Sequence, residues 1–204
     1  MFQLTELQHD ALVEIFNLGV GQAAAAMSRI VKEEVTMSVP MIAFQSRAEV
    51  AKTLGTSEGR RICAIAQQFE GAFNTEAFLM FPEEKSLEIV RLMVGQSLSM
   101  EELSEMEQEA MSEIGNIILN SCMATLANAS GRELSGSLPS YHVGTGDDIL
   151  GHSGKEWEGI VLTLKIDFKI ERHQIHGYVA FLLDMPAMQD LRGYVDAYLA
   201  RLTG

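Results

Sequence analysis

The sequence predicts an α/β protein, in the broad sense of that class, built from two related halves with mainly antiparallel strands. Three observations predict it. A sparse four-residue pattern occurs twice, segments with helical periodicity alternate with segments of period two, and the order of these segments is the same in both halves. We expect the 204 residues to form a single domain, residues 1–204, with repeat halves of approximately 6–95 and 105–203.

The repeated pattern consists of two acidic residues, an asparagine and a proline. In the first half these residues are Asp10, Glu14, Asn17 and Pro40. Their counterparts, each 99 residues later, are Glu109, Glu113, Asn116 and Pro139. Chance readily produces one Glu-x-x-Asn, but it seldom produces the same four-position spacing twice. The repeat therefore predicts two related sites.

The first half is expected to begin with a long helix, because its apolar residues cover most of a helical circumference. Strands follow where β-formers lie between turn residues, and Pro82 suits the first turn of a closing helix. The expected helices are Glu6–Lys32, Ala48–Leu54 and Glu83–Val94, and the expected strands are Thr36–Ser46, Arg61–Phe69 and Phe73–Phe81.

The second half repeats this order. Its helix is expected to end at Gly131, and the segment Ile160–Ile170 alternates apolar and polar residues, which is typical of a strand with one buried face. Such strands favour antiparallel pairing under a layer of helices. The expected helices are Met106–Ser130 and Met185–Leu202, and the expected strands are Ser137–Val143, Gly159–Ile170 and Gln174–Leu183.

The polar residues of the repeat fall on one narrow stripe of each long helix. At about 100° per residue, Asp10, Glu14 and Asn17 lie within ~60° of one another, with Gly21 between them. Apolar residues cover most of the other sides, so each helix should be largely buried with its stripe facing solvent. The second helix forms the same stripe from Glu109, Glu113, Asn116 and Asn120.

An ordinary explanation of these stripes is that any buried helix needs one solvated face, and surface glutamates are common. Asparagine, however, is a poor helix former without a local backbone role in the middle of a helix. Its placement twice beside a glutamate indicates a requirement from outside the helix. A divalent cation bound by Asp10, Glu14 and Asn17, or by the second set, is a further alternative, but one helix offers too few converging oxygens for a tight site.

Composition narrows the class of protein. The formal net charge of −13 and the pI near 4.7 argue against binding to nucleic acid, which requires clustered lysine and arginine. No run approaches the roughly 20 apolar residues that cross a bilayer, so we expect a cytoplasmic protein without a membrane partner. Cys63 and Cys122 lack metal-type spacing and are expected to be reduced core residues.

The glycines of Gly19-Val20-Gly21 lie within a helical pattern rather than after a strand. This placement favours close packing of the helix over a phosphate-binding loop. Gly21 also lies on the polar stripe, where the missing side chain leaves room for a partner. Because Asn120 occupies the corresponding place in the second half, the two sites are expected to differ in activity.

The pattern Asp-x3-Glu-x2-Asn-x22-Pro, from Asp10 to Pro40, resembles the signature of the CheC/CheX/FliY family of response-regulator phosphatases. The second copy matches at Glu113, Asn116 and Pro139 and departs at Glu109, where the family has aspartate or serine. Two signatures in a chain of this length resemble the two-site CheC branch, and the similarity covers nearly the whole chain.

The resemblance implies a central sheet with helices outside it and a phosphatase acting on a phosphorylated CheY-like response regulator. It implies that Asn17 and Asn116 enter the regulator's active site and orient water, while Glu14 and Glu113 pair with a regulator lysine. The required Mg²⁺ is expected in the partner, and no cofactor or metal is expected on this chain. Residues expected to assist docking are Asp10, Glu109, Gly21 and Asn120.

Other functions compete with this interpretation. A non-catalytic adaptor that binds CheD or a response regulator would use the stripes as docking ridges, and a generic acidic scaffold would bind neither partner. Turnover of phosphate by catalytic amounts of the chain separates the phosphatase from both alternatives.

Overall fold

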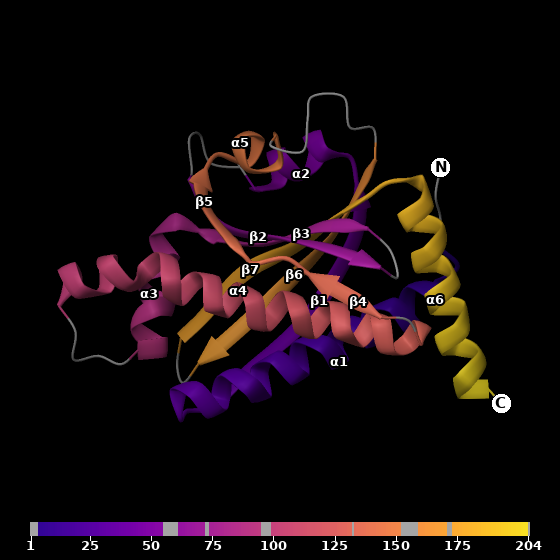
Figure 1. Ribbon diagram of the computed structural model, residues 1–204, viewed down its shortest axis with the longest axis horizontal. Helices are drawn as coiled ribbons and strands as arrows, with labels where there is room; N and C mark the ends of the chain where they lie inside the picture. The colour runs from indigo at the N-terminus through magenta and orange to yellow at the C-terminus, as the bar shows by residue number, and fades with distance from the viewer. Residues whose placement is uncertain are drawn as a thin grey trace.

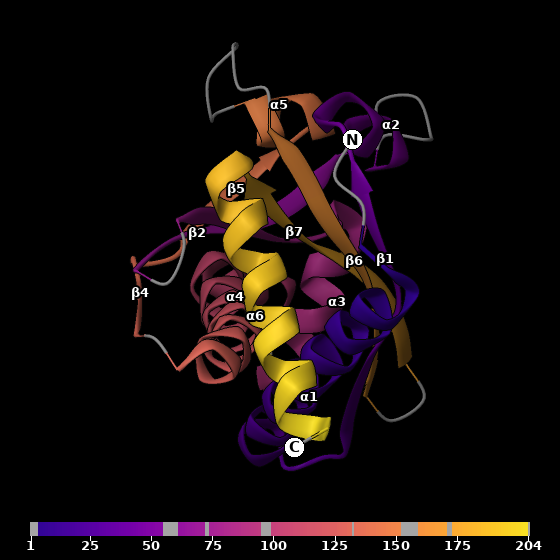
Figure 2. The same cartoon turned by 90° about the vertical axis from the view of Figure 1, so that its right-hand side faces the viewer.

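The chain forms a seven-stranded sheet between two layers of helices (Figure 1). The computed structural model describes residues 4–54, 61–71, 74–94, 99–131, 133–151, 159–170 and 173–203. One face of the sheet carries the short helices α2 (Arg47–Leu54) and α5 (Gly146–Gly151). Figure 2 shows the longer helices together on the other face. These are α1 (Glu6–Val31), α3 (Glu83–Val94), α4 (Met100–Ser130) and α6 (Met185–Thr203). The predicted α/β class with an antiparallel sheet and outer helices is confirmed.

The sheet interleaves the two halves of the sequence. Its strands follow the order β1-β6-β7-β3-β2-β4, β5 also pairs with β2, and every pairing is antiparallel. The first strand of each half therefore pairs with the second strand of the other half. The strands are β1 (Val35–Gln45), β2 (Ile62–Gly71), β3 (Thr75–Pro82), β4 (Leu134–Gly136), β5 (Ser140–Gly144), β6 (Ile160–Ile170) and β7 (His173–Leu183).

The 99-residue repeat is visible in the strand register. β1 spans residues 35–45, and β4 with β5 spans 134–144, which is the same interval 99 residues later. β1 shifts register on β6 between Ser38 and Met41. At the equivalent place on β2, β4 ends at Gly136 and β5 begins at Ser140. Each half thus has one break in its first strand, and the proline of the pattern lies in that break.

Apolar side chains fill both faces of the sheet. A large cluster lies between the sheet and the four longer helices, and a smaller one lies under α2 and α5. In the large cluster the rings of Phe16 and Phe181 stack with centroids 5.4 Å apart. Burying an aromatic side chain of this kind stabilises the fold by roughly 1.5–3 kcal/mol. The free thiols of Cys63 and Cys122 are both buried, as expected of reduced core residues.

α1 and α4 cross at close range within this layer. A Cβ on Gly19 would lie 2.9 Å from the Cα of Cys122, so only glycine permits this approach of the two backbones. The interpretation of Gly19 as a packing residue is confirmed, whereas a Cβ on Gly21 would meet no atom within 4 Å.

α4 begins six residues earlier than the sequence pattern indicated, at Met100 rather than Met106. Ser99 forms a capping box with Glu102, in which each side chain accepts a hydrogen bond from the other residue's backbone N–H. The first two turns are mostly polar and exposed, so they carry little apolar periodicity. The helix ends where expected, with Gly131 in the left-handed conformation at φ 69°.

Two further expectations on the second half need correction. The expected strand Ser137–Val143 begins only at Ser140, as β5, because the chain is out of the ladder at residues 137–139, and the short β4 before this break was not predicted. α5 was not predicted, since six residues give too short a pattern; it is the counterpart of α2, beginning 99 residues later. The other element boundaries agree with the structure to within two residues.

α1 is also long and apolar enough to cross a membrane by length and composition, which qualifies the expectation that no segment approaches this limit. It is the one helix in the described ranges that does so. Half of its most apolar window is buried inside the molecule, against the sheet and the neighbouring helices. This burial is typical of the central helix of a folded domain.

Candidate functional site

The first set of pattern residues lies on α1 as predicted. Asp10 and Glu14 are exposed, and Asn17 is half-buried, one turn further along the same stripe. The expectation that the Asn17 amide points freely into solvent is wrong. Both of its polar atoms are bonded to the protein's own backbone.

Asn17 completes the hydrogen bonding of the break in β1. Its Oδ1 accepts from the backbone N–H of Val39 at 3.0 Å, and its Nδ2 donates to the carbonyls of Val13 at 3.0 Å and Val39 at 3.5 Å. Val39 precedes Pro40, which has no N–H, and neither residue pairs with β6. The side-chain amide therefore replaces a neighbouring strand at this point. This bonding accounts physically for the spacing between Asn17 and Pro40 in the first half.

The second set of pattern residues converges on one surface groove. Glu109 and Glu113 are exposed on α4, and Asn116 is half-buried beside them. Pro139 lies across from the helix in the loop between β4 and β5, so residues far apart in the sequence form opposite walls. The groove has a volume of about 490 Å³ and is lined by Val94, Met106, Glu109, Ala110, Ser112, Glu113, Asn116, Leu138 and Pro139.

Asn116 has a different bonding pattern from Asn17. Its Oδ1 accepts from Asn120 Nδ2 at 2.7 Å and from Gln67 Nε2 at 3.5 Å. Within the described ranges, its Nδ2 has no acceptor in hydrogen-bonding distance, and no side-chain nitrogen or oxygen is both buried and unpaired there. The amide nitrogen of Asn116 is therefore accessible and free to donate.

The break in the second half is held by Gln67 instead of by the asparagine. Gln67 Nε2 donates to the carbonyl of Ser137 at 2.7 Å, and the backbones of Gln68 and Ser137 are joined by Ser137 N–H donating to the Gln68 carbonyl at 2.8 Å. Sequence reasoning missed Gln67, which is 3% exposed. The signal that could have found it is a polar residue on the buried face of β2, between the buried Ile65 and Phe69 two positions away on either side.

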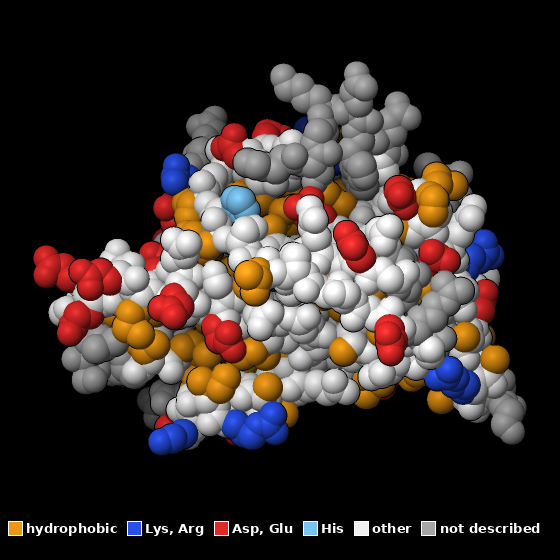
Figure 3. All heavy atoms as spheres, viewed as in Figure 1, with side chains coloured by type: hydrophobic (Ala, Val, Ile, Leu, Met, Phe, Trp, Pro, Cys, Tyr) orange, Lys and Arg blue, Asp and Glu red, His pale blue; other side chains and the backbone are white. Residues whose placement is uncertain are grey.

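Exposed apolar side chains border both sets. Leu138 is 91% exposed and Met106 39% exposed at the groove, while Leu18 and Met41 are about half exposed beside the first set. Figure 3 shows hydrophobic and acidic side chains alternating over the face that carries α4. Exposed apolar groups beside charged ones are typical of surfaces that bind another protein. The sequence analysis did not single out these residues, although one of them adjoins the proline in each half.

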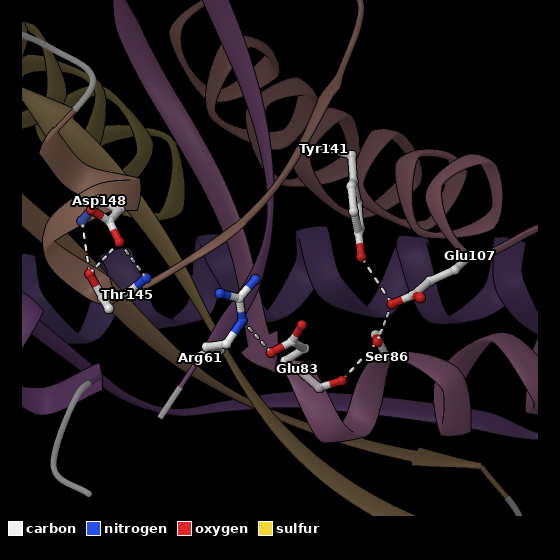
Figure 4. A network of polar contacts seen from close by, with 7 residues as sticks. All are labelled: Arg61, Glu83, Ser86, Glu107, Tyr141, Thr145 and Asp148. Atoms are coloured by element: carbon white, nitrogen blue, oxygen red, sulfur yellow. Dashed lines mark hydrogen bonds and ion pairs between the residues drawn. The ribbon is translucent and has the colours of Figure 1, made fainter. Parts of the chain in front are cut away.

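A polar network holds α4 against its neighbours at the groove (Figure 4). Glu107 on α4 accepts hydrogen bonds from Tyr141 Oη on β5 at 2.9 Å and from Ser86 Oγ on α3. Burial, the nearby Cys63 and the bond to Glu107 raise the pKa of Tyr141, so the phenol remains protonated. The network fixes α3 and α4, which line the groove, relative to β5, which directly follows the wall formed by Leu138 and Pro139.

The remaining titratable groups offer no obvious alternative chemistry in the described residues. Burial raises the pKa of both Cys63 and Cys122 to about 12, which keeps the thiols protonated and poor as nucleophiles. His173 pairs with Glu88 and His176 with Asp167, so the two histidines face different partners. No cluster of three or more metal-ligating side chains occurs in the ranges that the structure describes.

The fold and the site define a class of protein with a duplicated, interleaved sheet and an asparagine–glutamate stripe on each of two surface helices. No protein-family model matches the chain. The chain is 28% identical to the CheY-P phosphatase CheC of Bacillus subtilis over 139 residues, 67% of this chain. The alignment spans 66% of that relative's length, slightly less than two thirds.

Solved structures share the fold. FliY of Thermotoga maritima superposes with a TM-score of 0.75 at 19% identity, covering 97% of this chain and 100% of that one. FliM of H. pylori, from a FliG–FliM complex, gives 0.66 at 9% identity over 93% of this chain and 100% of that chain. A CheX from Desulfovibrio desulfuricans gives 0.52 at 15% identity over 84% and 100%. The predicted resemblance to the CheC/CheX/FliY family is confirmed.

Proposed function

We propose that this chain accelerates hydrolysis of the aspartyl phosphate of a CheY-like response regulator in chemotaxis or a related two-component pathway. The similarity to a CheY-P phosphatase supports this activity. The observation that carries it is the groove on α4, where Glu113 and Asn116 lie together and the Asn116 amide nitrogen is free to donate. A set made only of carboxylates and an amide suits positioning of water rather than nucleophilic attack.

The reaction requires little covalent help from this chain. The oxygen of a water molecule forms a bond to phosphorus while the bond between phosphorus and the aspartyl oxygen breaks. The products are the free aspartate carboxylate and dihydrogen phosphate, which keeps both hydrogens of the water. Because the chemistry depends on in-line approach, a donor that holds the water oxygen in place supplies much of the acceleration.

Asn116 would supply that donor. Its side-chain oxygen, Oδ1, already accepts hydrogen bonds from Asn120 and Gln67. The group that Asn116 offers to the groove is therefore the N–H of its side-chain amide and not an oxygen lone pair. This N–H would hold the water oxygen or a phosphoryl oxygen. Asn17 would act in the same way at the first site once its bonds to Val13 and Val39 give way.

Glu14 and Glu113 would set the docking register by pairing with a lysine of the regulator, since both carboxylates are exposed one turn before the asparagines. Asp10 and Glu109 would assist from the preceding turn. The exposed Leu138 and Met106 would contribute apolar contact area around the charged pair. The Mg²⁺ and the phosphorylated aspartate belong to the regulator in this proposal.

The test of the activity is phosphate release from a phosphorylated CheY-like regulator with this chain at substoichiometric concentration. We expect the parent to accelerate release, and the double substitution of Asn17→Ala with Asn116→Ala to abolish the acceleration. Thermal unfolding of the double variant is the control for its fold. Full activity in the folded double variant would contradict the assignment, and binding without turnover by the parent would favour a non-catalytic adaptor of the regulator or of CheD.

Charge reversal separates docking from chemistry. We expect Glu14→Lys with Glu113→Lys to raise the KM for the phosphorylated regulator about tenfold or more, because each lysine would repel the regulator's lysine. Titration of the beryllofluoride-activated regulator measures the affinity directly. If activity fell while this affinity stayed unchanged, the glutamates would have a role in the chemical step instead.

A further inference from the structure

We propose that Gln67 is a positioning residue for Asn116: it holds the strand break of the second half and thereby leaves the Asn116 amide nitrogen free. This inference rests on the proposed function. Gln67 lies on β2 opposite the break between β4 and β5, and it is 3% exposed. A buried polar side chain at such a place is expected to satisfy specific partners.

Two backbone carbonyls fix the direction of the amides. The backbone carbonyl of Asn116 accepts a hydrogen bond from Asn120 Nδ2 at 2.7 Å. Because a carbonyl can only accept, the side chain of Asn120 must present its nitrogen there. The same nitrogen lies 2.7 Å from the side chain of Asn116, which must therefore present Oδ1. The Ser137 carbonyl likewise requires the nitrogen of Gln67 at 2.7 Å. The orientation of Asn116 thus follows from acceptors that cannot change their role.

Space for this cluster comes from Gly136 on β4. A Cβ at this position would lie 2.9 Å from Gln67 Nε2 and 3.2 Å from Asn120 Oδ1. The glycine therefore permits the two amides to pack beneath the strand. The cluster thus depends on residues from three elements, namely β2, α4 and β4.

The strand break of the first half has no cluster of side-chain amides equivalent to that of Gln67, Asn116 and Asn120. The residue 99 positions after Gln67 is Ile166, which lies opposite the break in β1, and the counterpart of Asn120 is Gly21. Neither side chain can form a hydrogen bond. Asn17 bonds the break itself, through the backbone of Val39.

The exposure of the residue before the proline differs according to which side chain bonds the strand break. Val39 is 2% exposed in the first half, whereas its counterpart Leu138 is 91% exposed. Where the asparagine holds the break, the apolar side chain turns inward. Where Gln67 holds it, the apolar side chain is presented at the groove. Gln67 therefore holds the break in place of Asn116, Asn120 fixes which atom of Asn116 is available, and the exposed Leu138 adjoins both.

The test replaces Gln67 by the residue that occupies its place in the other half, Gln67→Ile, in the full chain. The same change one residue along, Gln68→Ile, is the matched control, since Gln68 is exposed and its side chain lies on the opposite face. The first readout is the side-chain amide NMR signals of Asn116 and Asn17. We expect faster solvent exchange at Asn116 than at Asn17 in the parent, and altered Asn116 signals only in Gln67→Ile.

The second readout is turnover of the phosphorylated regulator. With the first site removed by Asn17→Ala in every chain, we expect Gln67→Ile to lower kcat at least about tenfold, with KM within about twofold of the Asn17→Ala chain and Gln68→Ile without effect. Unaltered Asn116 signals in Gln67→Ile, or equal exchange at both asparagines in the parent, would overturn the inference. Gln67→Met, which is close to glutamine in length and lacks the amide that bonds Ser137, provides the same test if Gln67→Ile does not fold. A parent without turnover would refute the phosphatase while the NMR comparison still decides the role of Gln67.

Discussion

At the scale of single residues, one asparagine pattern supports two different bonding states. The side-chain amide of Asn17 forms hydrogen bonds to the backbone of Val39 in the strand break of the first half. In the second half Gln67 bonds the break, and Asn116 does not. Equivalent positions in a duplicated chain can therefore differ in hydrogen bonding while the pattern itself stays the same. The divergence depends on residues outside the pattern, at positions 67 and 120.

The two asparagines should differ in their contributions to stability. Asn17→Ala leaves the N–H and the carbonyl of Val39 without partners in a part-buried break, which should lower the free energy of unfolding by about 1–3 kcal/mol. Asn116→Ala removes an acceptor whose donors have other bonds, so its effect should be about 1 kcal/mol or less. Urea unfolding of the two single variants measures the difference, and equal losses would contradict the tethering role of Asn17.

At the scale of elements, α1 and α4 carry the sites and are packed directly against each other. Their crossing depends on Gly19, whereas Gly21, two residues further along, meets nothing. The polar network of Glu107 then fixes α4 relative to α3 and β5. The helical wall of the groove is thus positioned by the packing of α4 against α1 and α3.

The two glycines of α1 provide a matched pair of substitutions. Gly19→Ala places a Cβ 2.9 Å from the Cα of Cys122 and should destabilise the protein by about 1–3 kcal/mol, because the helices must move apart. Gly21→Ala meets no neighbour and should stabilise the helix by up to about 1 kcal/mol. Thermal or urea unfolding would show opposite signs for the two variants. A loss of stability in both would mean that α1 tolerates no side chain along this stretch.

The sequence predicted those elements that local patterns specify. Long helices and two-faced strands show their periodicity directly, which is why β6 and α3 lie where expected. The break between β4 and β5, the early start of α4 and the short α5 were missed, because a polar helical turn and a six-residue helix leave weak local signals. The pattern residues were found through the repeat, whereas Gln67 acts across 49 residues of sequence on Asn116 and belongs to no local pattern.

At the scale of the whole molecule, the duplication is interleaved. β1 pairs with β6 and β2 pairs with β4 and β5, so the outer strands at both edges of the sheet are exchanged between halves. The same exchange assembles the second site, since Gln67 comes from the first half and Asn116 from the second. Neither half contains a complete sheet or a complete second site.

This exchange predicts how the chain behaves when it is divided between α3 and α4, into residues 1–97 and 98–204. Each fragment would lack the strand that covers the edge of its hairpin and the helix that packs against its long helix, leaving large apolar surfaces exposed. We expect each fragment to be unfolded or aggregated by circular dichroism and size-exclusion chromatography. Refolding the two together should restore a 1:1 complex with the parent's spectrum, because the crossing strands and the contact of α1 with α4 then form between fragments. A soluble, cooperatively unfolding fragment on its own would show that one half is a sufficient folding unit and that the exchange is not required.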